Sequence, residues 1–286
     1  MTGDLGGNSD ATKTLEKIVA IGPDAHFLGG DMSYSDITPE QAWCDYVRGI
    51  IGPRMPFELV AGNHEHDSKT DGFIRKFAAC MPDKLGASGD YGVQYYAALE
   101  GLVRVVSISP DLKIDGHSYR YNPGSADRTW LERSVAEAKS AGMWVVVVQH
   151  KVCITAGTKS CEIGEELTDW LAANVDLVLM GHDHTYQRSH QLSCVAVNRV
   201  QSSCIEDTDG NHKRGNGAVF VISGVGGRIR EIDHSDSEKG YFAALMGEGD
   251  SGAGHGLVRL DITGSTISAR FVGSDTNWSD SFSIHR

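Results

Sequence analysis

Four times in its first two thirds, the chain passes from a short apolar stretch directly into a turn that carries polar side chains. These apolar stretches are residues 25–29, 57–61, 144–149 and 175–180. Residues 144–149 form a continuous, mostly β-branched run, which is typical of a strand covered on both faces. Segments with helical spacing of apolar residues separate the stretches. This alternation of strands and helices predicts a layered α/β fold.

Capping residues indicate where the helices begin. Ser9 or Asp10 can cap a first helix, and Thr38, followed by a proline and then by Gln41, can cap a second. Two more helices are expected at residues 125–141 and near residues 163–173. Additional strands are expected around residues 93–98 and 102–109.

Beyond Arg188 the helical periodicity fades, and short strands are expected at residues 218–223, 257–262 and 266–272. No internal repeat or low-complexity linker divides the chain. We therefore expect a single catalytic domain over residues 1–286, whose last third supplies a second sheet. A separate C-terminal domain is the alternative.

Composition narrows the class of protein. The formal net charge is -12 and the isoelectric point is about 5.4, whereas a general nucleic-acid or membrane-surface binder needs a basic face. No apolar run approaches the length of about 18 residues that a membrane-spanning helix needs. An anionic small molecule remains a possible ligand, because bound metal cations can dominate the local field.

The chain contains six cysteines and no Cys-x-x-Cys pair, which argues against a structural zinc site. Their even number and loop positions suggest disulfides, although six cysteines allow 15 pairings. Pairing of neighbours predicts Cys44–Cys80, Cys153–Cys161 and Cys194–Cys204. Disulfides would place the protein outside the cytoplasm, in a secreted or periplasmic location, and reduced cysteines in a cytoplasmic enzyme are the alternative.

Potential metal ligands follow the predicted strands. Sites in layered α/β folds form at the carboxyl ends of strands, so these side chains can converge on one edge of a sheet. Each one alone has an ordinary explanation: Asp4 as a turn residue, Asn63 as a cap and Tyr34 as core filler. The set as a whole is hard to explain by structural needs, and it comprises Asp4, Asp31, Tyr34, Asn63, His64, His150, His182 and His184.

The types of ligand indicate the kind of metal. Carboxylates, imidazoles, an amide oxygen and a phenolate, without a thiolate, suit iron, zinc or manganese. The set is too large for one ion. An aspartate that bridges two ions roughly 3.5–4 Å apart is the arrangement expected for hydrolytic chemistry.

Five sequence blocks carry a family resemblance. They resemble the conserved blocks of calcineurin-like metallophosphoesterases and, more narrowly, of purple acid phosphatases. Gly6 stands where the wider superfamily has a histidine, and Tyr34 ends the second block, which favours Fe(III). The stretches Tyr186-Gln187-Arg188 and 220–227 match the narrower pattern as well. The blocks are Asp4-Leu5-Gly6, Gly30-Asp31-Met32-Ser33-Tyr34, Gly62-Asn63-His64-Glu65, His150, and Gly181-His182-Asp183-His184.

The resemblance implies a four-layer α/β/β/α sandwich of two mixed sheets flanked by helices, and a role for each ligand. An iron(III) ion would be held by Asp4, Asp31, Tyr34 and His184. A second ion, zinc, manganese or Fe(II), would be held by Asn63, His150 and His182, with Asp31 as the bridge. His64 would help the leaving oxygen to take a proton.

The implied reaction is the hydrolysis of a small phosphate monoester by in-line attack of a hydroxide held on the metals. A phosphodiesterase or nucleotidase with the same site is the second hypothesis, and a metal- or phosphate-binding protein without turnover is the third. Substrate contacts are expected from Asn63 and His64, with His66 and Lys151 as further candidates.

Two departures from the family pattern affect these expectations. Plant-type members carry histidines soon after the fourth block, where this chain has Lys151 and then Cys153. A lysine there is expected either to contact phosphate or to lie solvated on the surface. The β-sandwich domain that precedes the catalytic domain of plant enzymes is not seen, and we expect an upstream segment, such as a signal peptide with the start of a strand, before Met1.

Overall fold

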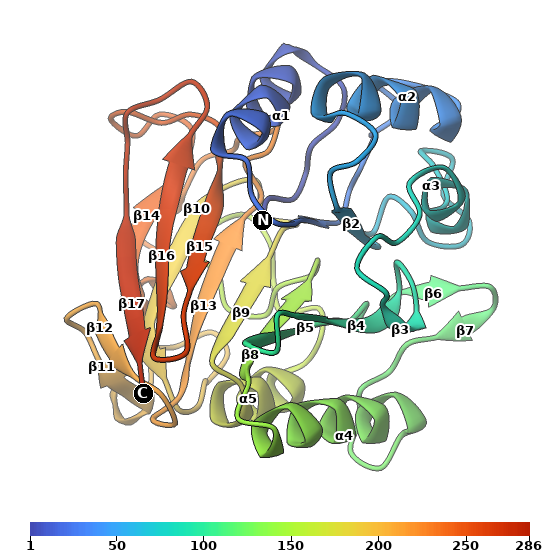
Figure 1. The fold of residues 1–286 in the computed structure, drawn as a ribbon. Helices are drawn as coiled ribbons and strands as arrows, with labels where there is room; N and C mark the ends of the chain where they lie inside the picture. Colours follow the sequence, from blue (N-terminus) through green and yellow to red (C-terminus); the bar gives the residue numbers. More distant parts are fainter.

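The computed structural model describes residues 1–286 and contains two β layers between helices (Figure 1). The larger sheet has nine strands in the order β11-β10-β13-β9-β8-β5-β4-β3, with β14 also pairing with β10. Its four central strands β5, β8, β9 and β13 run parallel. The strands are β3 (Ser88–Asp90), β4 (Gln94–Leu99), β5 (Val103–Ser107), β8 (Trp144–Gln149), β9 (Leu177–Met180), β10 (Tyr186–Leu192), β11 (Ile205–Asp207), β13 (Ala218–Ser223) and β14 (Phe242–Met246).

The second layer consists of two pieces that the first residues of the chain connect. A four-stranded sheet has the order β12-β17-β16-β15, and a parallel pair is formed by β1 and β2. Thr2 forms a parallel bridge with Leu28 of β1, while Met1 and Val258 of β15 exchange two backbone hydrogen bonds. The strands are β1 (His26–Gly29), β2 (Phe57–Val60), β12 (Asn211–Lys213), β15 (Gly256–Ile262), β16 (Thr266–Gly273) and β17 (Ser281–His285).

The side chains of β8 show how the core is divided. Val146 and Val148 belong to a hydrophobic cluster between the two layers, whereas Val145 and Val147 belong to a larger cluster beneath the helices. Both faces of this strand are therefore buried, as its continuous apolar sequence predicts. Helices α4 (Ala126–Ser140) and α5 (Glu165–Asn174) pack on the larger sheet, and α1 (Ser9–Ile21) contacts α2 (Glu40–Ile51) and β15.

The four-layer α/β/β/α prediction is confirmed, with one correction to the assignment of strands. The last third of the chain supplies strands to both layers: β13 lies beside β9 in the larger sheet, whereas β15, β16 and β17 lie in the second layer. Strand β10 directly follows the His-x-His turn and was not expected, because its sequence alternates polar and apolar residues only weakly. The remaining elements are α3 (Ile74–Cys80), the hairpin of β6 (Lys113–Ile114) and β7 (His117–Ser118), and the short helices Ser202–Cys204 and Lys239–Tyr241.

Two helix caps differ from the prediction. The cap of α1 is Asn8, whose side chain accepts hydrogen bonds from the backbone of Asp10 and Ala11, so neither Ser9 nor Asp10 is the cap. Pro39 occupies the cap position of α2, where no side chain caps the helix, so Thr38 is not its cap. The predicted cap of α1 is therefore displaced by one or two residues, and that of α2 by one.

All three expected disulfides are present: Cys44–Cys80, Cys153–Cys161 and Cys194–Cys204. The first connects α2 to α3, and the second closes a short loop that follows β8. Among the helices, none has both the length and the apolar character needed to cross a bilayer.

Candidate metal centre

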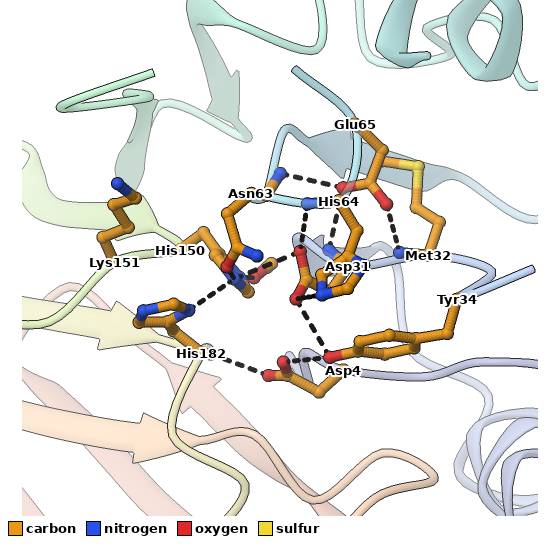
Figure 2. A network of polar contacts seen from close by, with 12 residues as sticks. Asp4, Asp31, Met32, Tyr34, Asn63, His64, Glu65, His150, Lys151 and His182 are labelled. Carbon is orange, nitrogen blue, oxygen red and sulfur yellow. Dashed lines mark hydrogen bonds and ion pairs between the residues drawn. The ribbon is translucent and has the colours of Figure 1, made fainter. Parts of the chain in front are cut away.

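The predicted ligands lie on turns that follow strands of both layers (Figure 2). Asp31 and Asn63 follow β1 and β2 of the second layer, whereas His150 and His182 follow β8 and β9 of the larger sheet. The ligands therefore meet between two sheets and not, as predicted, at one edge of a single sheet. Four of them have left-handed backbone: φ is 58° at Asp4, 54° at Asp31, 51° at Tyr34 and 70° at His182. Residues with a side chain rarely adopt this conformation, and strain of this kind concentrates at functional sites. The conformation of these turns therefore directs the ligand side chains towards one another.

Glycines let these turns approach one another closely. A Cβ on Gly62 would lie 2.2 Å from Oδ1 of Asp31, and a Cβ on Gly30 would lie 2.4 Å from Nδ1 of His150. A Cβ on Gly181 would lie 2.7 Å from both Oδ2 of Asp4 and the carbonyl oxygen of Gly29. The glycines that begin the sequence blocks are thus required by the space that the ligands occupy.

A first group of atoms that could bind a metal surrounds Nε2 of His150. This nitrogen lies 3.0 Å from Oδ1 of Asn63, 3.1 Å from Nδ1 of His182 and 3.2 Å from Oδ1 of Asp31. The other nitrogen of His150 donates to the carbonyl of Gly29 at 2.8 Å. Nδ1 of His150 therefore carries a hydrogen, and Nε2 is the nitrogen of this ring that is available to a metal ion.

His182 is oriented in the same way by an acidic side chain. Its Nε2 lies 2.7 Å from a carboxylate oxygen of Glu162, and its backbone N–H donates to Oδ2 of Asp4 at 2.8 Å. The hydrogen bond from His182, together with the bond from Lys151, lowers the pKa of Glu162 to about 2. Glu162 is thus an ionised acceptor, and the lone pair of Nδ1 of His182 faces His150.

A second group of atoms that could bind a metal surrounds the hydroxyl of Tyr34. It lies 2.6 Å from Oδ1 of Asp4, 2.9 Å from Nε2 of His184 and 3.0 Å from Oδ2 of Asp31. Asp4 is fully buried, and Asp31 and His184 are nearly so. One hydroxyl hydrogen faces two carboxylate oxygens here and can bond fully to only one of them.

Asp31 connects the two groups, with Oδ1 in the first and Oδ2 in the second. Burial raises the pKa of Asp31, but His150 and His64 outweigh burial and hold the pKa below its usual range. Buried acceptor atoms that face one another need a cation between them. The atoms that could bind a metal are all oxygens and nitrogens, which suit such a cation. The arrangement therefore fits two metal ions that share Asp31. Asp31, His150 and His182 also have the spacing of a metal-binding group.

His64 lies at the rim of the second group rather than among its donors. Its Nε2 is 3.7 Å from Oδ2 of Asp31, its Nδ1 is hydrogen-bonded to Asp71, and its side chain is 27% exposed. A ring held by one nitrogen with the other facing the site is arranged to transfer a proton.

The two weaker candidates for substrate contact lie differently. Lys151 is buried and forms ion pairs with Asp111 and Glu162, so it is not a solvated surface lysine. His66 is partly buried and makes no side-chain hydrogen bond with the predicted ligands, and its Nδ1 has no partner.

Sequence reasoning missed the residues that hold the ligands in place. Glu65 accepts hydrogen bonds from the backbone N–H groups of Asp31, Met32 and Gly62 at 2.7–2.9 Å and so joins the turns after β1 and β2. Its place in the block Gly62-Asn63-His64-Glu65 was a signal for this role. Asp71 and Glu162 stand in loops with no motif of their own.

Comparison with known proteins agrees with this geometry. The family model of calcineurin-like phosphoesterases matches residues 1–186. The chain therefore belongs to the calcineurin-like phosphoesterase family. Within that family it is similar to purple acid phosphatases, as the tyrosine in the second block suggests.

Three comparisons define this similarity. The chain is 26% identical over 283 residues to Fe(3+)-Zn(2+) purple acid phosphatase 12 of Arabidopsis thaliana, which covers 91% of this chain and 56% of that protein. It is 27% identical over 255 residues to purple acid phosphatase 21 of the same plant, covering 82% of this chain and 57% of that protein. The structure of purple acid phosphatase PPD1 from yellow lupin covers 100% of this chain and 53% of that chain, with a TM-score of 0.71 at 19% identity. The chain thus spans about half the length of these relatives.

Proposed function

We propose that the protein is a binuclear metal-dependent hydrolase of phosphate monoesters. The observation that carries this proposal is the position of Asp31, which offers one carboxylate oxygen to each of two groups of buried acceptor atoms. Family membership supports phosphoester chemistry. When bound, two cations would ionise a water molecule and neutralise the phosphoryl oxygens, whose charge is spread in the transition state.

The ligand roles in this proposal follow the two groups of donor atoms. Asp4, Tyr34 and His184 would hold an iron(III) ion, since a phenolate and a carboxylate are hard ligands. Asn63, His150 and His182 would hold the second ion, which would be zinc, manganese or Fe(II). Asp31 would bridge the two ions.

His64 is the proposed proton donor to the leaving oxygen. Asp71 fixes its Nδ1, so Nε2 faces the site and can carry a proton. Asn63 would stand beside the substrate as well as contributing its amide oxygen. The three disulfides support a location outside the cytoplasm, in a secreted or periplasmic protein.

Turnover of p-nitrophenyl phosphate, measured together with metal content, tests the proposal. We expect hydrolysis by the wild-type protein and loss of both activity and bound metal in Asp31→Ala. Glu16→Gln, an exposed change on α1, is the matched control and should keep both. A metal-loaded wild-type protein that does not hydrolyse the ester would contradict the proposal. Faster hydrolysis of bis-p-nitrophenyl phosphate would show a phosphodiesterase instead.

A further inference from the structure

Glu162 lies between a proposed metal ligand and the one lysine that adjoins the site. One of its carboxylate oxygens is 2.7 Å from Nε2 of His182, and the other is 2.9 Å from Nζ of Lys151. Glu162 belongs to none of the sequence blocks that carry the family resemblance. Its role must therefore be derived from its contacts in this chain.

The first contact fixes the hydrogen of His182. A carboxylate paired with lysine only accepts hydrogen bonds, so Nε2 of His182 must donate. The lone pair of Nδ1 is then directed to Nε2 of His150, 3.1 Å away. A carboxylate behind a histidine in this way sets the ring's tautomer and orientation and increases its strength as a ligand.

The second contact engages Lys151 fully. Its ammonium group lies 2.9 Å from Glu162, 2.7 Å from the carboxylate of Asp111 and 3.2 Å from the carbonyl oxygen of Asp111. A lysine ammonium has three hydrogens, and three acceptors surround this one. In Figure 2 the Lys151 side chain lies apart from Asp31 and His64. No hydrogen of Lys151 remains for a phosphate at the metal centre.

The loop that carries Glu162 is tied to the His-x-His turn on a second side. Glu162 follows Cys161, which is bonded to Cys153. Within that closed loop, the hydroxyl of Thr155 donates to a carboxylate oxygen of Asp183 at 2.6 Å. His182 and Asp183 are thus both held by residues 153–162.

We propose that Lys151 and Glu162 form a positioning pair that sets how tightly His182 holds the second metal ion, and that Lys151 acts through Glu162 rather than by contacting substrate phosphate. This inference rests on the proposed binuclear site. It assigns to Lys151 a role different from the phosphate contact that its sequence position suggests.

Metal retention by the holoenzyme tests the pair without relying on activity. The purified protein is dialysed against graded concentrations of EDTA, and the retained metals are counted by mass spectrometry. We expect Glu162→Gln to release one ion per chain at about 10- to 100-fold lower chelator concentration than the wild type, while the other ion is retained. Glu16→Gln should match the wild type, and circular dichroism identifies any variant that has not folded.

Lys151→Met separates the two roles of the lysine. If Lys151 acts through Glu162, this variant loses the same ion, the double variant is no worse than Glu162→Gln alone, and inhibition by inorganic phosphate is unchanged at saturating metal. If Lys151 contacts phosphate, metal retention matches the wild type and inhibition by phosphate weakens, which overturns the inference. A wild-type protein that binds no metal defeats the proposed function itself. A wild type with two ions and variants that retain both defeat only the positioning pair.

Discussion

Gly181→Ala is the change whose effect on the site follows most directly from the packing. Gly181 connects β9 to the His-x-His turn, and its backbone φ does not require glycine. The space around it does require glycine, because an added Cβ would lie 2.7 Å from Oδ2 of Asp4 and from the carbonyl oxygen of Gly29, and 3.1 Å from Nδ1 of His150. Two of these three neighbours are proposed metal ligands, and the third is backbone.

The size of the effect can be worked from these distances. An ordinary contact begins at 3.4 Å, so the turn must move by about 0.7 Å, the difference from 2.7 Å. Overpacking of this kind destabilises a protein by about 1–3 kcal/mol. A shift above roughly 0.5 Å also exceeds what a metal or catalytic site tolerates. The hydrogen bond from His182 to Asp4 at 2.8 Å lies on the same turn and would be lengthened.

Urea unfolding and metal analysis measure the two consequences. We expect Gly181→Ala to lower the free energy of unfolding by about 1–3 kcal/mol and to weaken metal binding by at least about 10-fold. Gly49→Ala is the matched control, since Gly49 lies inside α2 with no atom within 4 Å of an added Cβ. That change should stabilise the helix by up to about 1 kcal/mol and leave metal binding intact. A Gly181→Ala protein as stable and as metal-rich as the wild type would refute the reasoning.

Three other changes test separate features. Burial raises the pKa of Glu58 to about 7, from 4.5 in the unfolded chain. Between these two pH values the folded chain binds a proton that the unfolded chain has lost. The free energy of unfolding therefore falls as the pH rises through this range. In urea unfolding, Glu58→Gln should therefore be as stable as the wild type near pH 4.5 and more stable by about 2 kcal/mol at pH 8, a value reduced to allow for solvent screening. The same difference in stability at both pH values would contradict this. His64→Gln should lower kcat about 100-fold or more with metal content unchanged, whereas loss of metal would make His64 a ligand. Removal of metal with a chelator should abolish turnover and lower the melting temperature, and re-addition should restore both.

The buried strands of the larger sheet were the part of the fold that the sequence predicted best. Residues 144–149 and 218–223 were assigned to strands with the bounds that the structure has, because continuous apolar β-branched sequence has few other uses in a layered fold. The convergence of His150 and His182 followed from one topological rule, that carboxyl ends of parallel strands meet at one edge, because β8 and β9 are parallel neighbours. Asp31 follows β1 of the second layer, so its place beside them depends on how the two layers pack, which this rule does not cover.

The supporting residues were not predictable, for a physical reason. Glu162, Asp71 and Asp111 act through contacts across 7–40 residues of sequence, from loops whose conformations carry no periodic signal. The helix caps at Asn8 and Pro39 were missed by one or two residues, because neighbouring residues compete for a cap and only the backbone decides among them.

The count of metal ions in the purified protein, taken with its visible spectrum, tests the central claim most directly. Two acceptor-lined positions that share Asp31, one of them beside Tyr34, predict two ions per chain and a visible absorption band from tyrosinate bound to Fe(III). Tyr34→Phe should lose the band. One ion or none per chain, or a band that persists in Tyr34→Phe, would contradict the account.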